Sequence, residues 1–177
     1  MKTKNKNSII DSFWNFLSKL LLPFCILCVA LVLFLNVFFI AKVPSGSMLN
    51  TIKIGDMLLV KNSFFCNEIE RGDICVFKKT GENFLLVKRV VGLPGEKVEM
   101  KDGTVYINDK KLKESYVSSE CDTNQVFYVP DNSYLFLGDN RANSSDARYW
   151  ENPYINKKYI KGIAQCKVYP HYSKLKK

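Results

Sequence analysis

The sequence predicts a mostly-β domain that follows one N-terminal transmembrane helix. Two observations support this fold class: residues 20–41 contain no charged side chain, and the rest of the chain consists of short β-branched and aromatic runs bounded by Gly, Pro, Asn and Asp. The 177 residues suffice for one modest domain. Because 47% of them are hydrophobic and 24% are charged, the composition excludes a disordered or collagen-like chain.

Residues 20–41 are the expected membrane anchor, with Asn36 as their one clearly polar residue. As a helix they would be about 33 Å long, which matches a hydrocarbon core of about 30 Å, and Pro23 would lie in the first turn, where a missing N–H costs least. A cleaved signal peptide is the alternative. The apolar stretch is too long for one and ends in Phe39-Ile40-Ala41-Lys42 instead of a small-x-small site, so we expect an uncleaved anchor.

The charges on either side of the anchor predict its orientation. Residues 1–19 contain one acidic residue, Asp11, against lysines at positions 2, 4, 6 and 19. The positive-inside bias therefore places residues 1–19 in the cytoplasm and residues 42–177 on the extracytoplasmic side of the cell membrane. The outer part has a net charge of +6 (22 basic less 16 acidic residues), which suits a surface over a phospholipid bilayer with anionic lipids. Nucleic-acid binding fits neither this topology nor the scattered lysines.

The domain of residues 42–177 is expected to consist of strands and tight turns. Its predicted strands are 57–60, 74–77, 84–91, 98–100, 104–107, 126–129, 134–137 and 163–169. Lys101-Asp102-Gly103 predicts a hairpin turn, with its glycine free to adopt positive φ, and Asn108-Asp109-Lys110-Lys111 predicts another. A short helical turn is expected at residues 48–52. Residues 95–131 form a hairpin-rich excursion from the same domain.

The histidine and cysteine content limits the possible kinds of site. The one histidine, His171, argues against a histidine-based catalytic triad and against a multi-histidine metal site. The cysteines outside the anchor contain no Cys-x-x-Cys pair, and their spacing assigns no disulfide. These cysteines are Cys66, Cys75, Cys121 and Cys166.

Pro44-Ser45-Gly46-Ser47-Met48 places two serines around a glycine just before the expected helical turn. The first N–H groups of such a turn are free and glycine allows a tight bend, so the Ser47 hydroxyl would project beside an anion site. Ser45 would add a second hydroxyl. The alternative is a flexible linker between the anchor and the domain.

The strand expected at residues 84–91 contains Lys88. Strand alternation gives this lysine apolar neighbours on its own face, namely Phe84, Leu86 and Val90. Its amine would then be desolvated and its pKa lowered from about 10.4 toward about 7 to 8, which would supply a neutral base near neutral pH. The alternative is an edge lysine that extends past its neighbours into water.

Residues 138–148 form a polar loop rich in Gly, Asp and Asn, residue types that tolerate tight loop dihedrals. Four charged residues alternate in sign along the loop and suggest ion pairs that fix it: Asp139, Arg141, Asp146 and Arg148. Ser144 or Ser145 could orient an amine or hydroxyl nearby. The alternative is an ordinary polar surface loop.

Together these segments resemble bacterial type I signal peptidases. A nucleophile needs a base, the chain has no suitable histidine, and a buried lysine can take that role. The resemblance runs from the anchor to about Pro170. It rests on four motifs in order: Pro44-Ser45-Gly46-Ser47-Met48, Arg71-Gly72-Asp73, Lys88-Arg89-Val90-Val91-Gly92-Leu93-Pro94-Gly95, and Gly138-Asp139-Asn140-Arg141 continuing to Arg148-Tyr149-Trp150.

The resemblance implies a role for each candidate residue. Ser47 matches the family nucleophile and Lys88 the general base, while Ser45 matches an oxyanion-hole hydroxyl that acts with the Ser47 N–H. Ser144 matches the serine that orients the lysine. Structural positions around the site are matched by Asp139, Arg141, Asp146 and Arg148. The resemblance also implies a signal-peptidase-like all-β catalytic domain that needs no metal and no cofactor.

The same resemblance implies a membrane-bound serine endopeptidase that removes signal peptides of translocated preproteins after a small-x-small site, close to the secretion machinery. Its substrate would lie extended against strands beside the site. Residues near the reactive groups in sequence would line shallow apolar pockets for small side chains. These are Val43, Met48, Ile52, Leu86 and Val87.

The chain departs from the family pattern at two positions. Asn50 stands where the family usually has proline, which predicts a looser turn behind the nucleophile, and Ala142 stands where aspartate is common, which removes one loop contact. Neither change removes a reacting group, so we expect activity to survive. The aromatic pairs Phe64-Phe65 and Tyr149-Trp150 are expected to pack in the core, with contact to the membrane interface as the alternative.

Two other functions fit part of the pattern. A self-cleaving serine–lysine protease of the repressor type shares the serine–lysine pair but carries a DNA-binding helical domain and no anchor. A membrane-tethered β-module that only binds would keep the fold without activity, and Asn50 would be the hint of such a pseudoenzyme.

Overall fold

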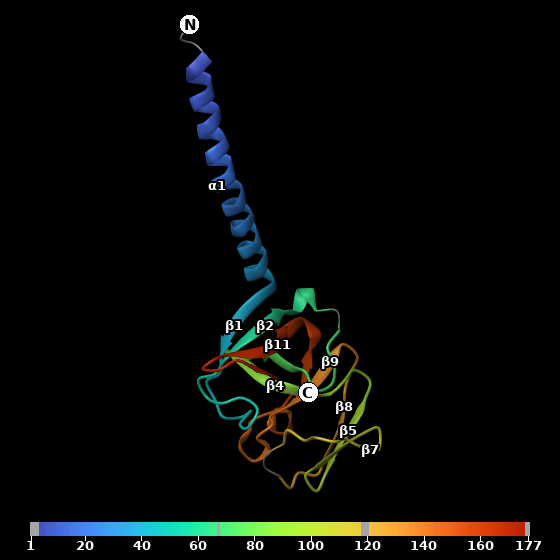
Figure 1. Ribbon diagram of the computed structural model, residues 1–177. Coiled ribbons are helices and arrows are strands. Elements are labelled where there is room, and N and C mark those ends of the chain that lie inside the picture. Colours follow the sequence, from blue (N-terminus) through green and yellow to red (C-terminus); the bar gives the residue numbers. More distant parts are fainter. Residues whose placement is uncertain (1–3, 67, 118–120, 176–177) are drawn as a thin grey trace. The chain divides into compact units, whose positions relative to one another are not determined.

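The computed structural model describes residues 4–66, 68–117 and 121–175, and the chain divides into two compact units, Met1–Val37 and Phe38–Lys177 (Figure 1). The first unit contains the helix α1 (Lys4–Val37). Its stretch Asp11–Val37 is 27 residues long and apolar enough to cross a membrane. At 1.5 Å per residue this stretch measures about 40 Å, which exceeds a hydrocarbon core of about 30 Å and leaves room for tilt.

The helix begins well before the predicted start of the anchor at residue 20. Pro23 therefore lies inside α1 instead of in its first turn, and its missing N–H removes a helical hydrogen bond there. Asn36 donates its side-chain amide to the Val32 carbonyl at 2.7 Å. The amide thus finds a partner within the helix, which explains how a polar residue fits an apolar segment.

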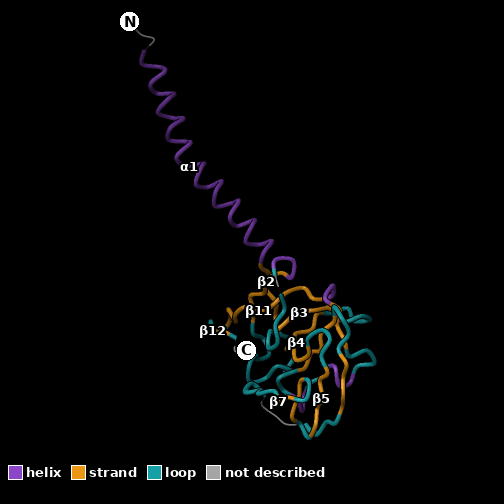
Figure 2. The backbone as a smooth tube through the Cα atoms, turned by 90° about the vertical axis from the view of Figure 1, so that its right-hand side faces the viewer, coloured by secondary structure: helices purple, strands orange, loops and turns teal. Residues whose placement is uncertain are grey.

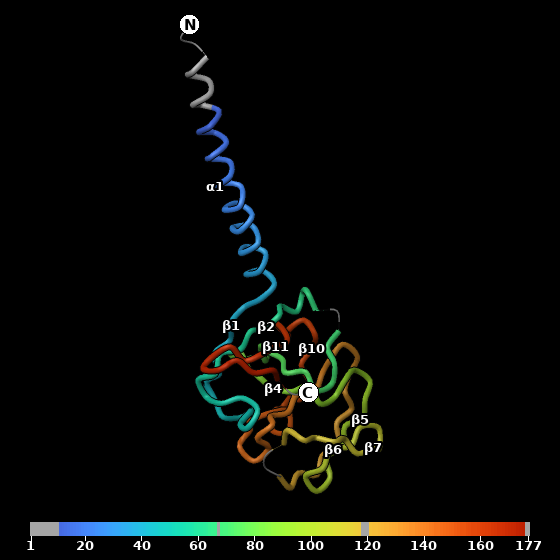
Figure 3. Tube along the Cα trace, viewed as in Figure 1, coloured from blue at the N-terminus to red at the C-terminus, as the bar shows by residue number. Residues whose placement is uncertain are grey.

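The helix also ends before residue 41, the predicted end of the anchor. After Val37 the chain enters β1 (Phe38–Lys42), which pairs antiparallel with β2 (Met57–Asn62), with Phe38 opposite Lys61. An apolar run alone does not separate a helix from a strand, so the prediction extended the helix into the first strand. Figure 3 follows the chain by colour from α1 through β1 into β2.

The second unit is almost all strand and loop, as the sequence predicts (Figure 2). Its larger sheet is antiparallel and has the order β1-β2-β11-β3-β4-β9-β10, with β12 paired to β11. The further strands of this sheet are β3 (Ile74–Lys78), β4 (Leu85–Gly92), β9 (Ser133–Leu137), β10 (Tyr154–Asn156), β11 (Ile160–Tyr169) and β12 (Ser173–Lys174). Single-turn 3-10 helices accompany them: η1 (Ser63–Phe65), η2 (Arg141–Asn143), η3 (Ala147–Tyr149) and η4 (Lys157–Tyr159).

The predicted excursion of residues 95–131 forms a separate four-stranded sheet with the order β7-β6-β5-β8. Its strands are β5 (Lys97–Lys101), β6 (Thr104–Ile107), β7 (Lys110–Lys111) and β8 (Gln125–Tyr128). Both predicted hairpin turns are confirmed, because Asp102-Gly103 and Asn108-Asp109 all have positive φ, the geometry of a type I′ turn. Each predicted strand overlaps an observed one, and the missed strands are β1 and the short β7, β10 and β12.

Strand β9 is buried on both faces and connects the parts of the core. Leu135 and Leu137 pack with residues of β5, β6 and β8, whereas Tyr134 and Phe136 pack on the opposite side. There the Phe136 ring stacks on Phe77 with 4.3 Å between centroids. Burial on both faces accounts for the uninterrupted apolar run of this strand. The strand leads directly into the loop that begins at residue 138.

The expectation that both aromatic pairs pack in the core is wrong for Phe64, Phe65 and Tyr149. Phe64 is 86% exposed and Tyr149 is 61% exposed. Phe64 belongs to η1, a single turn after β2 that carries no buried residue, and its ring meets Phe65 edge-on at 5.2 Å. Trp150, in contrast, packs against two of the core clusters.

Candidate active site

Ser47 lies in the loop of residues 43–56, which is fixed to the core at several points. Two hydrogen bonds close the base of the loop, from the Val43 N–H to the Asp56 carbonyl and from the Gly55 N–H to the Val43 carbonyl, both at 2.9 Å. Met48 is 1% exposed and packs in a cluster with residues of β2 and β3. Ser47 itself is 8% exposed, so the alternative of a flexible linker is wrong.

The predicted helical turn follows Ser47 and is closed by hydrogen bonds from the Thr51 and Ile52 N–H groups to the Met48 carbonyl, at 3.1 and 2.8 Å. Asn50 has φ of 75°, a left-handed conformation that asparagine tolerates and that proline, fixed near −65°, cannot adopt. The Thr51 hydroxyl also donates to Asp139 at 2.5 Å. The asparagine therefore fits a turn that has its own hydrogen bonds, and the predicted loosening is not observed.

Most of the loop of residues 138–148 is buried and internally bonded, so the alternative of an ordinary surface loop is wrong. Asp146 accepts two hydrogen bonds from the Arg148 guanidinium, at 2.8 and 2.9 Å, and both side chains are fully buried. The second oxygen of Asp146 also accepts the Gly138 N–H at 2.9 Å. Arg148 in turn donates to the Arg141 carbonyl at 2.7 Å.

The predicted alternation of ion pairs holds for one pair only, Asp146 with Arg148. Asp139 pairs instead with Arg89 of β4, which donates to both of its oxygens at 2.8 and 2.7 Å. Arg141 pairs with Glu114, in the segment before β8, at 2.5 Å. These two partners lie far away in sequence, so a pattern within the loop could not reveal them.

The two loops meet through Asn140, a residue to which the sequence assigned no role. Its N–H donates to the Ser47 carbonyl at 3.1 Å, and its side-chain amide donates to the Gly46 carbonyl at 3.0 Å. The main chain before and at Ser47 is therefore held by the loop that follows β9. Among the described residues, none accepts a hydrogen bond from the Ser47 N–H, so this donor is free.

Gly138 allows Ser144 and the Ser47 main chain to approach each other. A Cβ at position 138 would lie 2.2 Å from Ser144 Oγ and 2.6 Å from the Ser47 carbonyl oxygen, closer than real Cβ contacts. Ser144 Oγ is buried and has no hydrogen-bond partner among the described residues. Such a hydroxyl costs free energy to bury, and unpaired groups of this kind concentrate at functional sites.

Lys88, on β4, is 3% exposed, so the alternative of an edge lysine in water is wrong. Desolvation lowers the pKa of its amine from 10.5 to about 8, and Arg148 acts in the same direction. Asp146 and Asp139 act to raise this pKa. Because each carboxylate is bonded to its own buried arginine, its field at the amine is weakened, and desolvation dominates.

Ser47 and Lys88 line the same small pocket, with a volume of about 100 Å³. Ser45 also lines it, and the Ser45 and Ser47 hydroxyl oxygens lie 3.4 Å apart. Four of the five predicted pocket residues are among its walls: Val43, Met48, Leu86 and Val87. Ile52 is the exception, because it is fully buried beside Met48 in the core.

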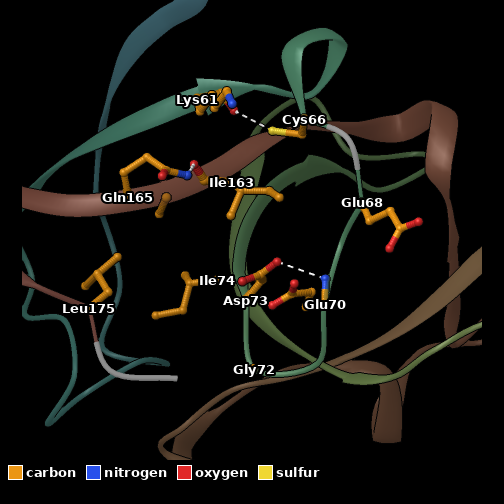
Figure 4. Close-up of a pocket in the computed structure, with 11 residues that line it drawn as sticks. Lys61, Cys66, Glu68, Glu70, Gly72, Asp73, Ile74, Ile163, Gln165 and Leu175 are labelled. Atoms are coloured by element: carbon orange, nitrogen blue, oxygen red, sulfur yellow. Dashed lines mark hydrogen bonds between the residues drawn. The ribbon is translucent and has the colours of Figure 1, made fainter.

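A wider pocket of about 580 Å³ contains none of the predicted site residues (Figure 4). Acidic side chains line part of it, and Asp73 accepts a hydrogen bond from the Glu70 N–H at 2.9 Å. In the part of the chain that the structure describes, no three His, Cys, Asp or Glu side chains are grouped so as to hold a metal ion.

Comparisons with known proteins point to one family. The family model described as "Signal peptidase, peptidase S26" matches residues 16–169. A probable signal peptidase I-2 from Synechocystis sp. is 35% identical over 95% of this chain and 79% of that protein. Signal peptidase I from Leptolyngbya laminosa is 41% identical over 72% of this chain and 67% of that protein. A crystal structure of a signal peptidase I from Enterococcus faecalis is 31% identical and covers 55% of this chain and 97% of that one, with a TM-score of 0.49.

Gly138→Ala is expected to lower the free energy of unfolding by about 1–3 kcal/mol, the usual cost of forcing a methyl group into a packed site. Denaturant unfolding of the full chain in detergent measures the loss. Adding Ser144→Gly should restore part of it, because that change removes one of the two clashes. Strictly additive effects of the two substitutions would contradict the close approach of Ser144 to Gly138.

The left-handed conformation of Asn50 gives a second test of the site. Asn50→Gly should change the free energy of unfolding by a few tenths of a kcal/mol at most, and Asn50→Ala should lower it by about 1 kcal/mol. Asn50→Pro should lower it most, because the ring forbids the observed φ of 75°. The same unfolding assay ranks the three variants, and a proline variant as stable as the parent would refute this turn geometry.

Proposed function

The chain belongs to the signal peptidase family, peptidase S26, and on this premise we propose that Ser47 and Lys88 are the nucleophile and general base with which it cleaves signal peptides. One observation carries the proposal: the two side chains line one pocket, in which burial lowers the pKa of Lys88 to about 8. An amine with this pKa is partly neutral near physiological pH and can accept a proton. The reaction is acyl transfer from the scissile peptide bond to a serine.

In the first half of the reaction, neutral Lys88 accepts the proton of the Ser47 hydroxyl as Ser47 Oγ attacks the scissile carbonyl carbon. The carbonyl oxygen becomes an oxyanion and needs donors in place before the attack. The free Ser47 N–H is one donor. The exposed Ser45 hydroxyl, whose oxygen lies 3.4 Å from that of Ser47, is the second.

In the second half, protonated Lys88 gives its proton to the leaving amine of the mature protein. A water molecule, deprotonated by the same lysine, then attacks the ester of the acyl-enzyme. The bond between Ser47 Oγ and the acyl carbon breaks, Lys88 returns the proton to Ser47 Oγ, and the signal peptide leaves with a free carboxylate. Ser144 orients the lysine in this scheme, since its buried hydroxyl has no other partner among the described residues. The loop that carries Ser144 is held in place by its charged residues: Asp139, Arg141, Asp146 and Arg148.

The pocket suits a substrate with small side chains beside the scissile bond. A volume of about 100 Å³ accommodates an alanine side chain far better than an aromatic one, and its walls include Val43, Met48, Leu86 and Val87. These walls support the proposed cleavage after a small-x-small sequence. Phe84 and Leu85 are 57% and 42% exposed at the rim, where an extended peptide would lie.

The apolar stretch of α1 provides the membrane anchor in this proposal, with residues 1–19 in the cytoplasm and the domain on the extracytoplasmic side of the cell membrane. Ser47 follows Val37 by ten residues, so it cannot lie more than about 35 Å from the end of the helix. The exposed Phe64 ring would enter the lipid interface. Such tethering raises the local concentration of signal peptides that emerge from the secretion machinery without added affinity.

Ser47→Ala and Lys88→Met should each lower the cleavage rate by on the order of 10³-fold or more, because the two groups act as a unit. The assay uses the full chain in detergent and a preprotein with alanine at the positions before the cleavage site, with the new N-terminus identified by mass spectrometry. Ser173→Ala and Lys101→Met are matched controls outside the pocket and should keep full activity.

Each alternative function predicts a different result in the same assay. Full processing by either the Ser47 or the Lys88 variant would overturn the assigned chemistry. A wild-type chain that binds the preprotein and leaves it intact would be a tethered binding module. Cleavage of the chain itself in place of the preprotein would indicate a self-cleaving serine–lysine protease.

The pH profile tests the general base. Because the protonated amine is inactive, kcat/KM should fall about tenfold for each pH unit below about 8, the pKa of Lys88 in the free enzyme. Rates are measured from pH 5 to 10, with circular dichroism at each pH to verify that the domain stays folded. A profile that is flat down to pH 5 would exclude a lysine base.

A further inference from the structure

The segment between β7 and β8 approaches the active-site loop although it contributes to none of the family motifs. Leu112 anchors the segment, since its N–H donates to the Val105 carbonyl at 2.8 Å and its side chain packs against the core cluster beside the smaller sheet. Two residues later, Glu114 accepts hydrogen bonds from both terminal nitrogens of Arg141, at 2.5 and 3.2 Å. Glu114 and Arg141 are both nearly inaccessible to solvent, at 8% and 2% side-chain exposure.

Tyr116, two residues further on, covers the other arginine of the site. Its ring lies over the Arg89 guanidinium with 3.8 Å between the ring centroid and Cζ, and its hydroxyl donates to Glu114 at 2.9 Å. Burial and the neighbouring Glu114 carboxylate raise the pKa of the phenol, so the hydroxyl remains a donor. Tyr116 thereby shields the Arg89–Asp139 pair from water and ties it to the Glu114–Arg141 pair.

Further hydrogen bonds connect the two arginine pairs to the residues around Ser47. Asp139, held by Arg89, accepts the hydrogen bond from Thr51 in the turn that follows Ser47. Arg141, held by Glu114, donates to the Gly138 carbonyl at 3.0 Å, at the point where Ser47 and Ser144 approach each other. Both ends of the contact between the two active-site loops are therefore supported by the segment between β7 and β8.

We propose that Glu114 and Tyr116 are positioning residues for the Ser47–Lys88 reaction, acting through Arg141 and Arg89. The proposal rests on the proposed function and extends the site to the excursion of residues 95–131. Loss of the Tyr116 ring would hydrate the Arg89–Asp139 pair and loosen the turn behind Ser47. The pocket walls would stay in place, so substrate binding would change little while the reacting groups became misaligned.

The test compares Tyr116→Leu, Tyr116→Phe and Glu114→Gln in the full chain in detergent. Tyr116→Leu should lower kcat by on the order of 10- to 100-fold with KM nearly unchanged, the effect expected of a small displacement of reacting groups. Tyr116→Phe keeps the ring over Arg89 and should recover most of the rate. The kcat of Glu114→Gln should lie between those of the two tyrosine variants, because glutamine keeps the shape of the side chain and removes the charge that holds Arg141.

Matched controls come from two positions of the smaller sheet, the exposed Tyr128 and the half-buried Glu99, which pairs with Lys97. Tyr128→Leu and Glu99→Gln make the same chemical changes away from the arginines and should leave kcat at the wild-type value. Hydrogen exchange of the Ile52 N–H, which closes the turn after Ser47, gives a readout that needs no catalysis. It should become faster in Tyr116→Leu and stay unchanged in Tyr128→Leu.

The outcomes separate this proposal from the proposed function. Wild-type kcat and unchanged Ile52 exchange in a folded Tyr116→Leu protein would overturn the positioning role, as would a rise in KM at constant kcat. If Tyr116→Leu does not fold, the kcat and the Ile52 exchange rate of the isosteric Glu114→Gln variant test the positioning role instead. A processing rate unaffected by Ser47→Ala would refute the proposed function alone, because the exchange measurement still tests the coupling of the segment to the turn.

Discussion

Charge balance around a desolvated amine is the constraint on which this site depends. Two carboxylates act to raise the pKa of Lys88, and an unpaired carboxylate beside it would keep the amine protonated. Each carboxylate is instead bonded twice by its own buried arginine, Asp139 by Arg89 and Asp146 by Arg148. With both pairs close to neutral, the loss of hydration determines the pKa.

The same ion pairs also fix the geometry of the site. A buried ion pair adds little stability compared with apolar residues of the same size, so its value here lies in orientation. Asp139 connects β4 to the turn after Ser47 by accepting from both Arg89 and Thr51. Asp146 bonds the Gly138 N–H, at the position where a side chain would exclude Ser144. One set of groups thus controls both the protonation of Lys88 and the placement of Ser47.

Most of the fold could be predicted from local patterns, whereas the supports of the site could not. Alternation and turn residues identified most of the strands, both hairpins and the burial of Lys88, because these depend on neighbours in sequence. The partners of Arg89 and Arg141 are contacts between distant segments, and Glu114 and Tyr116 have no local signature. The first strand was missed for a related reason, since its residues continue the apolar run of α1 and differ from it only in their pairing with β2.

The lowered pKa of Lys88 has a cost in stability that follows from linkage. Below pH 8 the amine is charged in both states, and its burial disfavours the folded state by about 3 kcal/mol, the equivalent of a pKa lowered from 10.5 to about 8. Between pH 8 and 10.5 the unfolded chain binds more protons than the folded chain, so the cost diminishes as the pH rises. Above pH 10.5 the cost is absent. At working pH the three apolar clusters must offset it. A methionine would fill the same space without this cost, so packing alone gives no reason for an amine at this position, whereas the proposed proton transfer from Ser47 does.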